Sequence, residues 1–339
     1  MRILIDILHP AHVHFFRNFR TEMLERGHAV LVTAREKDVA IDLLEEFEIP
    51  HEVISTQRSG RLGLAGELLQ RSTRLTRIAR SFKPTVMTGI MGAAIAPVGR
   101  LLRVPTVVFY DTEFATRTNR WVYPLATFVS TPDSYRATVR GNHVTYPGYH
   151  ELAYLHPKWF APDPAKLAAY GLTPPYALVR FVSWQASHDI GQTSLSSDEK
   201  RSLVRTLLDR VPVVLSAEGT LPSDLEHLRL RGPAADIHHV LAHADLVVGD
   251  SGTMVSEAAV LGTPAVIIWP MVGDVHTDQI SYGLLARFKP NEFEGAVKQS
   301  ITFLTHGPPA RAHERMLKDK IDVTEWMLQF FEHHSHEWS

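Results

Sequence analysis

The chain of 339 residues contains no cysteine, which excludes disulfide scaffolds, thiolate zinc sites, iron–sulfur clusters and cysteine nucleophiles. It also lacks an apolar run of the roughly 18 residues that a membrane-spanning helix needs. Met1–Leu8 is a strand-like run without a cleavage-site pattern, so no signal peptide is expected. We therefore expect a cytoplasmic protein.

The chain also has no excess of positively charged residues. Lys and Arg number 35 against 37 Asp and Glu, a formal net charge of −2, and this balance argues against a nucleic-acid partner. Hydrophobic residues make up 45% and charged residues 21%, ordinary values for a chain with a core. The length predicts two domains at about 150 residues each. The 19 histidines are the one unusual count.

The first half of the chain alternates short apolar runs with helical patterns. We expect strands at Arg2–Leu8, Ala29–Thr33, His51–Ile54, Thr85–Thr88, Thr106–Phe109 and Thr127–Ser130, with helical segments between most of them. Such alternation implies parallel strands joined by right-handed crossovers. Residues 1–150 are therefore predicted to form a Rossmann-like domain.

Six prolines between Pro147 and Pro175 interrupt the pattern, so residues 151–175 are predicted to be a linker. Alternation resumes over residues 176–305, a second Rossmann-like domain, and residues 306–339 form an amphipathic helix and a tail. The predicted fold class is α/β, with two doubly wound parallel sheets and a cleft between the domains. In such sheets, ligands bind beyond the carboxyl ends of the strands.

One strand-to-helix turn in the second domain has the chemistry of an anion site. A buried strand ends at Gly249, and the helix that follows offers free N–H groups and the positive end of its dipole. Glu257, one turn deeper, suits the hydroxyls of a ribose. The predicted contacts are Asp250, Ser251, Gly252, Thr253 and Glu257. The alternative is an ordinary N-cap on a core helix, with Glu257 solvated.

This segment, from Ala244 to Pro264, resembles the donor-binding signature of GT-B glycosyltransferases and of the related non-hydrolysing UDP-N-acetylglucosamine 2-epimerases. More narrowly, the segments 180–189, 110–114 and 9–12 look like an uncharacterised glycosyltransferase-like family, domain of unknown function 354. The resemblance implies the GT-B fold and a nucleotide diphosphate-sugar, UDP-linked, as the donor substrate. No further cofactor is implied.

The resemblance also points to the loop after the first strand of the second domain. Its short polar groups would face the pyrophosphate, and Glu218 after the next strand would line the nucleotide. The candidates in this loop are Ser183, Ser187, His188 and Asp189. In GT-B enzymes the loop is often rich in glycine, whereas Trp184 and Gln185 stand here. The alternative is a surface loop that meets only water.

In the first domain, His9, His12 and His14 follow the first strand, and Asp111 and Glu113 follow another. The resemblance implies that the first of these loops contacts the acceptor or the donor sugar, with His9 as a substrate-binding candidate, and the second loop also follows a strand end and is expected to face the cleft. A histidine with an ordinary pKa near 6.5 can take the proton of an attacking hydroxyl. His12, Asp111 and Glu113 are the catalytic candidates, and which of them is the base stays open. The alternatives are a helix-capping histidine and an exposed acidic turn.

A basic run accompanies the third helix, and Glu67 is its only acidic residue. We expect a solvated helix face, or peripheral contact with the inner face of a membrane through Arg71, Arg74 and Arg77. The acceptor is predicted to be an unknown glycan or a lipid-linked molecule.

The leading hypothesis is a metal-independent glycosyltransferase, because the helix dipole and hydroxyls offset the phosphate charge and no DxD triplet occurs. A sugar-nucleotide 2-epimerase using Asp111, Glu113 and His188 is the second. A metal-dependent, barrel-type hydrolase with His12 and His14 as ligands is the third, and a non-catalytic binding protein is the last. The histidines at 238, 239 and 243 are assigned to a surface helix.

Overall fold

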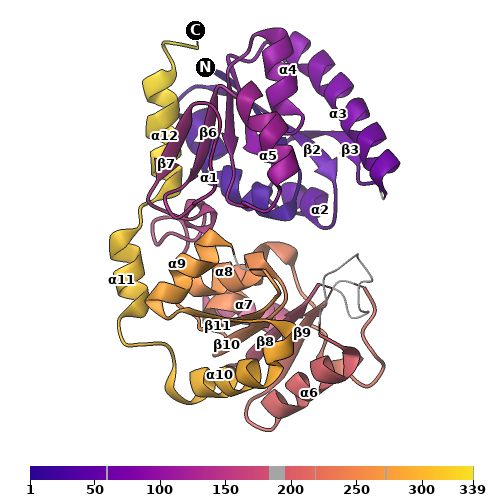
Figure 1. Ribbon diagram of the computed structural model, residues 1–339, viewed down its shortest axis with the longest axis vertical. Helices are drawn as coiled ribbons and strands as arrows, with labels where there is room; N and C mark the ends of the chain where they lie inside the picture. Colours follow the sequence, from indigo (N-terminus) through magenta and orange to yellow (C-terminus); the bar gives the residue numbers. More distant parts are fainter. Residues whose placement is uncertain (59, 183–194, 218, 272, 339) are drawn as a thin grey trace. The chain divides into compact units, whose positions relative to one another are not determined.

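The computed structural model describes residues 1–339 except 59, 183–194, 218, 272 and 339, and except the side chains of Arg61 and Arg117 (Figure 1). The chain forms two compact units, Met1–Trp159 together with Lys320–Ser339, and Phe160–Asp319. Each unit holds one parallel sheet. The predicted α/β class with two Rossmann-like sheets is confirmed.

The first unit contains a seven-stranded sheet in the order β3-β2-β1-β4-β5-β6-β7, with every neighbouring pair parallel. The chain winds to one side of β1 through β2 and β3 and then returns to its other side at β4, so the topological switch point lies between β1 and β4. The strands are β1 (Arg2–Ile7), β2 (Ala29–Glu36), β3 (His51–Thr56), β4 (Val86–Ile90), β5 (Thr106–Phe109), β6 (Phe128–Pro132) and β7 (His143–Tyr146).

The helices of the first unit bury apolar stripes against this sheet and against one another. In α1, Phe15, Phe16, Phe19 and Met23 are buried, and the ring centroid of Phe19 lies 4.8 Å from that of Phe331 in the C-terminal helix. The helices are α1 (Pro10–Glu25), α2 (Ala40–Glu46), α3 (Arg61–Phe82), α4 (Ile95–Leu102), α5 (Thr116–Val122) and α12 (Val323–His334).

The second unit contains a five-stranded parallel sheet in the order β12-β11-β10-β8-β9, with its switch point between β8 and β10. Its core packs beneath α6 and α10. The strands are β8 (Ala177–Phe181), β9 (Val213–Ala217), β10 (Leu246–Gly249), β11 (Ala265–Ile268) and β12 (Leu285–Phe288). The helices are α6 (Ser197–Leu208), α7 (Ile237–His243), α8 (Gly252–Val260), α9 (Asp274–Tyr282), α10 (Phe293–His306) and α11 (Ala312–Asp319).

The segment expected to be a linker, residues 151–175, is buried up to Leu155 and mostly exposed beyond it. A short 3₁₀ helix at His150–Ala153 is buried in the first unit, and Leu167 within a second one, Pro164–Tyr170, is buried in the second unit. The division between the units therefore falls at Trp159 and again at Lys320, where the chain returns to the first unit. No helix in the described parts of the chain is both long enough and apolar enough to cross a bilayer.

Candidate functional site

His12 lies in the first turn of α1, just beyond the carboxyl end of β1. Its Nδ1 accepts a hydrogen bond from the backbone N–H of Leu8 at 3.2 Å. Because an amide nitrogen can only donate, neutral His12 must carry its proton on Nε2. Burial above all, and then the imidazoles of His9 and His150, lower the pKa of His12 well below its ordinary value. Neutral His12 is therefore a hydrogen-bond donor at Nε2.

His9 has the role of a helix cap. Its Nδ1 accepts from the N–H of Ala11 at 3.2 Å, and its ring centroid lies 6.0 Å from that of His12. The capping alternative considered for a histidine in this loop thus applies to His9, and it fixes the backbone from which His12 projects.

Asp111 follows β5 and pairs with His150, a residue not singled out from the sequence. Asp111 Oδ2 lies 3.1 Å from Nδ1 of His150, and Thr112 Oγ1 donates to Asp111 Oδ1 at 2.9 Å. Burial lowers the pKa of His150, but the charge and hydrogen bond of Asp111 outweigh it and raise this pKa above its ordinary value. The Asp111 side chain is 28% exposed, so an oriented carboxylate faces solvent.

The structure thus pairs Asp111 with His150 in the first unit, and both act on the pKa of His12, which His150 lowers and Asp111 raises. Glu113, two residues beyond Asp111, is half-buried. A role for His150 could not be predicted from the sequence, because the residue lies where the prolines interrupt the pattern of strands and helices. Its burial beside Phe15, with ring centroids 4.6 Å apart, is a tertiary feature.

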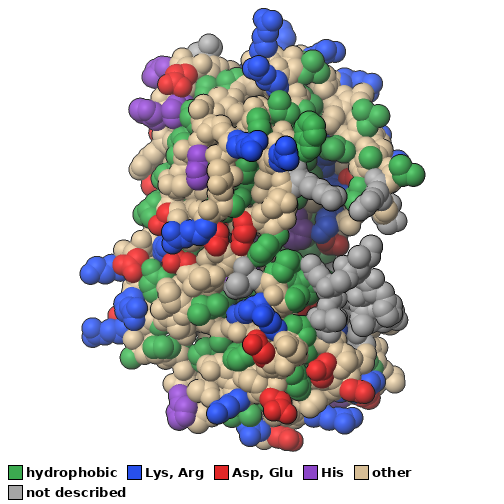
Figure 2. All heavy atoms as spheres, viewed as in Figure 1, with side chains coloured by type: hydrophobic (Ala, Val, Ile, Leu, Met, Phe, Trp, Pro, Cys, Tyr) green, Lys and Arg blue, Asp and Glu red, His purple; other side chains and the backbone are tan. Residues whose placement is uncertain are grey.

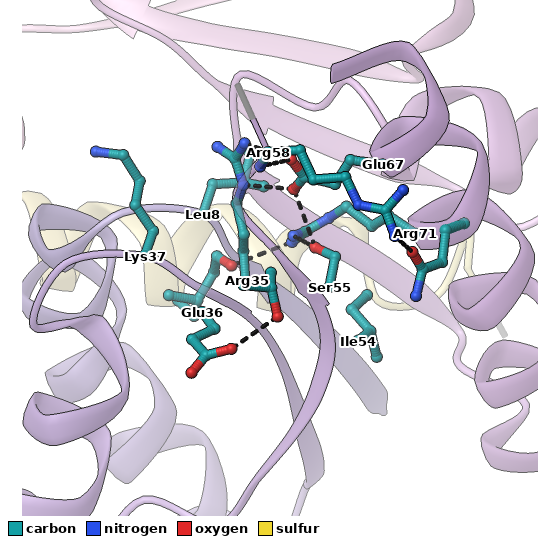
Figure 3. A network of polar contacts seen from close by, with 12 residues as sticks. Leu8, Arg35, Glu36, Lys37, Ile54, Ser55, Arg58, Glu67 and Arg71 are labelled. Atoms are coloured by element: carbon teal, nitrogen blue, oxygen red, sulfur yellow. Dashed lines mark hydrogen bonds and ion pairs between the residues drawn. The ribbon is translucent and has the colours of Figure 1, made fainter. Parts of the chain in front are cut away.

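A buried polar network lies at the ends of β1, β2 and β3 (Figure 3). Arg71 Nη2 lies 2.5 Å from Asp6 Oδ1, both side chains being 3% exposed, and donates to the carbonyl of Ile7 at 3.1 Å. Its Nη1 donates to Ser55 Oγ at 3.1 Å. The prediction that Arg71 contacts a membrane is wrong, because its guanidinium is committed to the interior.

Glu67 extends the same network. It accepts two hydrogen bonds from Arg35, at 2.6 and 2.8 Å, and one from the backbone N–H of Arg58 at 3.0 Å. Burial raises the pKa of Glu67, but the bonds from Arg35 and Arg58 outweigh this and lower it. The network links α3 to the ends of β1, β2 and β3, and His12 follows β1 in the chain.

In the second unit, the turn between β10 and α8 presents the expected helix start. Asp250 Oδ1 accepts from the N–H of Val182 at 2.7 Å and so links the ends of β10 and β8. Burial raises the pKa of Asp250, against the opposing effect of that bond and of Lys200. Ser251 occupies the N-cap position, yet its hydroxyl makes no capping hydrogen bond. Thr253 is exposed in the first turn.

Gly252 lies against His276 of α9, a residue not singled out from the sequence. His276 Nε2 lies 3.1 Å from the carbonyl oxygen of Gly252 and so donates to it. A Cβ at position 252 would lie 3.1 Å from the His276 ring. The absence of a side chain at position 252 therefore lets the His276 ring pack closely against the start of α8.

Glu257 is buried in α8 and pairs with His238 of α7. Glu257 Oε1 lies 3.0 Å from Nε2 of His238, and the two side chains are 7% and 1% exposed. The assignment of His238 to a surface helix is therefore wrong, since α7 turns this ring inward. The alternative of a solvated Glu257 is also wrong, because this carboxylate is buried against His238. The candidates Ser183, Ser187, His188, Asp189 and Glu218 lie outside the described residues.

The barrel-type metal hydrolase is contradicted by the fold, because the strands form two open sheets. His14 also points away from His12, as positions two apart on a helix do. Its buried ring stacks on Tyr154 at 5.3 Å between centroids. Among the described residues, no group of three His, Asp or Glu side chains is arranged to hold a metal ion.

Comparisons with known proteins bear on the fold. A family model described as "Protein of unknown function (DUF354)" matches residues 1–155, while no curated protein matches the chain. UDP-GlcNAc 2-epimerase from Methanocaldococcus jannaschii superposes with a TM-score of 0.70 at 11% identity, covering 98% of this chain and 100% of that one.

Two further solved structures share the architecture. MnaA of S. aureus, in a structure with UDP, gives a TM-score of 0.71 at 14% identity, with 100% and 98% of the two chains covered. The spinosyn rhamnosyltransferase SpnG, complexed with thymidine diphosphate, gives 0.65 at 15% identity, with 98% and 100% covered. The chain therefore has the GT-B fold. The resemblance found in the sequence, both to GT-B proteins and to the family of unknown function, is confirmed.

Proposed function

We propose that the chain is a GT-B glycosyltransferase that moves a sugar from a nucleotide diphosphate-sugar to a hydroxyl acceptor. The observation that carries the proposal is the start of α8. Ser251 leaves its hydroxyl uncommitted to capping, Gly252 has no side chain, and the positive end of the helix dipole lies at the carboxyl end of β10. The pyrophosphate would bind there, next to the switch point of the sheet.

The donor would be UDP-linked, and its ribose would meet the Glu257 carboxylate. His238 holds one oxygen of that carboxylate, which fixes the orientation of the group. The solved structures with UDP and with thymidine diphosphate share this fold and so support a nucleoside diphosphate as the ligand. The leaving phosphate would be stabilised by the helix end and by Ser251 and Thr253, without a metal ion.

Asp111 is the base that the geometry favours. Its carboxylate is partly exposed and is oriented by Thr112 and His150, whereas neutral His12 has its proton on Nε2 and is a donor. The acceptor proton would pass to Asp111 as the acceptor oxygen bonds to the anomeric carbon. The bond from that carbon to the phosphate oxygen breaks, and its electron pair leaves with the nucleoside diphosphate.

The proposal is tested by titrating the full chain with UDP, GDP and dTDP and with their sugar derivatives. We expect one nucleotide series to raise the melting temperature and its sugar form to release nucleoside diphosphate when an acceptor is added, with EDTA present. If none of these compounds shifts the melting temperature, the proposal is wrong.

A 2-epimerase is the second candidate, because several acid and base groups gather beside Asp111 and the fold matches that of such enzymes. The two are distinguished in heavy water without an acceptor. Deuterium entering C2 of the sugar would identify epimerisation, whereas release of nucleoside diphosphate without exchange at C2 identifies the transferase.

A further inference from the structure

The first turns of α3 present leucines to solvent. Leu62 is 90% exposed and Leu69 is 70% exposed, and positions seven apart lie on the same side of a helix. Leu64 and Leu68 are 47% and 42% exposed. Hydrophobic and basic side chains protrude together where α3 runs along the edge of the first unit (Figures 1 and 2). An exposed apolar group of this kind marks an interaction surface.

The opposite face of α3 accounts for the packing of the helix. Glu67, Arg71, Leu75 and Ala79, spaced four apart, are all buried. The outward leucines therefore have no part in holding α3 to the sheet. Leu62 and Leu69, the most exposed of them, are available to a partner, and we expect their substitution to leave the folded unit intact.

Basic side chains continue the outward face. Arg77 and Arg80 are exposed and lie eight and eleven positions after Leu69, on the same side of the helix. Arg58 is exposed as well, and its Nη2 donates to Gln70 at 3.1 Å, which holds its guanidinium beside the leucine turns. Within the described part of the chain, none of these three cations forms an ion pair with a carboxylate.

Acidic groups are lacking on this helix. Its one carboxylate, Glu67, is buried and bound by Arg35. A surface that combines apolar side chains with unpaired cations is complementary to the boundary between anionic headgroups and acyl chains. A protein partner would have to place a carboxylate opposite each guanidinium group, whereas the phosphates of an anionic bilayer can pair with all of them.

We propose that Arg58, Leu62, Leu69, Arg77 and Arg80, the α3 surface, adsorb the protein to an anionic bilayer. The leucines enter the interface and the arginines bind lipid phosphates. Adsorption of this kind needs no helix that crosses the membrane. Because α3 follows the parallel strand β3, it begins at the carboxyl edge of the sheet, the edge at which His12 and Asp111 follow their own strands. The α3 surface would thus hold that edge near a membrane-bound acceptor.

The test uses the full chain and co-sedimentation with vesicles of two compositions, phosphatidylcholine alone and phosphatidylcholine mixed with phosphatidylglycerol. We expect binding to the mixed vesicles only, weakened by salt. Leu62→Ser combined with Leu69→Ser should weaken binding by about tenfold or more, and so should Arg77→Gln combined with Arg80→Gln. Matched controls in the second unit, Leu208→Ser and Arg210→Gln, replace exposed residues of the same types and should bind as the wild type does.

Three results would overturn the proposal. These are no binding to mixed vesicles at low salt, undiminished binding by the leucine variant, or a dimer in light scattering that the leucine variant dissociates without lipid. The last result would assign the α3 surface to a second copy of the chain. Vesicle binding requires no nucleotide, so its outcome is separate from that of the nucleotide titration.

Discussion

Asp111 and His150 form a pair in which Oδ2 lies 3.1 Å from Nδ1. His12, in contrast, accepts a hydrogen bond at its own Nδ1 from the backbone N–H of Leu8. The pKa values of these two imidazoles thus shift in opposite directions, since that of His150 is raised and that of His12 is lowered. The carboxylate stabilises a charged ring at His150, whereas burial and the neighbouring imidazoles favour a neutral ring at His12. The pair supplies charge and orientation, and His12 supplies a donor.

This contrast predicts how stability depends on pH. Because the pKa of His150 is raised in the folded state, its pair with Asp111 contributes fully below the ordinary value of 6.5 and is lost as the pH rises through the raised pKa. Melting curves of the wild type and His150→Gln should therefore differ most below 6.5 and converge as the pH rises through the raised pKa of His150. A difference that is independent of pH would contradict the assignment.

His12 serves as the opposite case in the same experiment. Its lowered pKa means that the unfolded chain binds the proton more tightly, so the contribution of His12 is present above 6.5 and is lost as the pH falls. His12→Gln should remove part of the acid loss of stability that the wild type shows. If both variants change stability in the same direction with pH, the two environments are not those described.

Catalysis offers a second prediction. Asp111→Asn keeps the size of the side chain but removes the base, so kcat should fall by about 100-fold or more, with the Kd for UDP unchanged. Glu113→Gln is the matched control, since it removes the other carboxylate of the same loop. Loss of turnover in Glu113→Gln with near-normal turnover in Asp111→Asn would transfer the role to Glu113.

Much of the fold was predictable because buried parallel strands are continuous apolar runs. Ile3–Ile5 and Leu246–Val248 are fully buried, and the sequence alone marks both. The edge strands were harder. β7 (His143–Tyr146) and β12 (Leu285–Phe288) each have only one buried residue among four, so neither shows a clear apolar run.

The site was predictable only where it is local. The turn at Ser251 and Gly252 is contiguous, so its chemistry is visible in sequence. The pairing of His150 with Asp111 joins residues 39 positions apart, and no pattern in either segment indicates it. The burial of Arg71 did leave a signal, since Arg71 lies four positions from both Glu67 and Leu75, on the inward row of α3.

A third prediction concerns that buried arginine. Arg71→Met leaves the Asp6 carboxylate without its charge partner in the interior, and we expect a loss of about 3–5 kcal/mol in the free energy of unfolding. Urea denaturation measures it. Arg74→Met is the control, because Arg74 is exposed on the same helix and donates only to a backbone carbonyl. Equal losses of unfolding free energy in the two variants would show that the buried pair of Arg71 and Asp6 contributes no more to stability than an exposed arginine does.

The last prediction separates the parts of the donor site. Ser251→Ala should weaken UDP binding by about fivefold, the loss of one hydrogen bond of about 1 kcal/mol. Its effect on stability should be small, because the Ser251 hydroxyl does not cap α8. Gly252→Ala should weaken UDP binding more, since the added Cβ would lie 3.1 Å from the His276 ring and would shift that ring or the backbone at the start of α8.

Glu257→Gln completes the test, with calorimetry on UDP and on inorganic pyrophosphate as the measurement. A ribose contact predicts weaker binding of UDP and unchanged binding of pyrophosphate, whereas Ser251→Ala weakens both. Thr302→Ala, at an exposed position of α10, controls for the loss of a surface hydroxyl. Should Glu257→Gln weaken both ligands equally, its pair with His238 supports the start of α8 and does not contact the nucleoside.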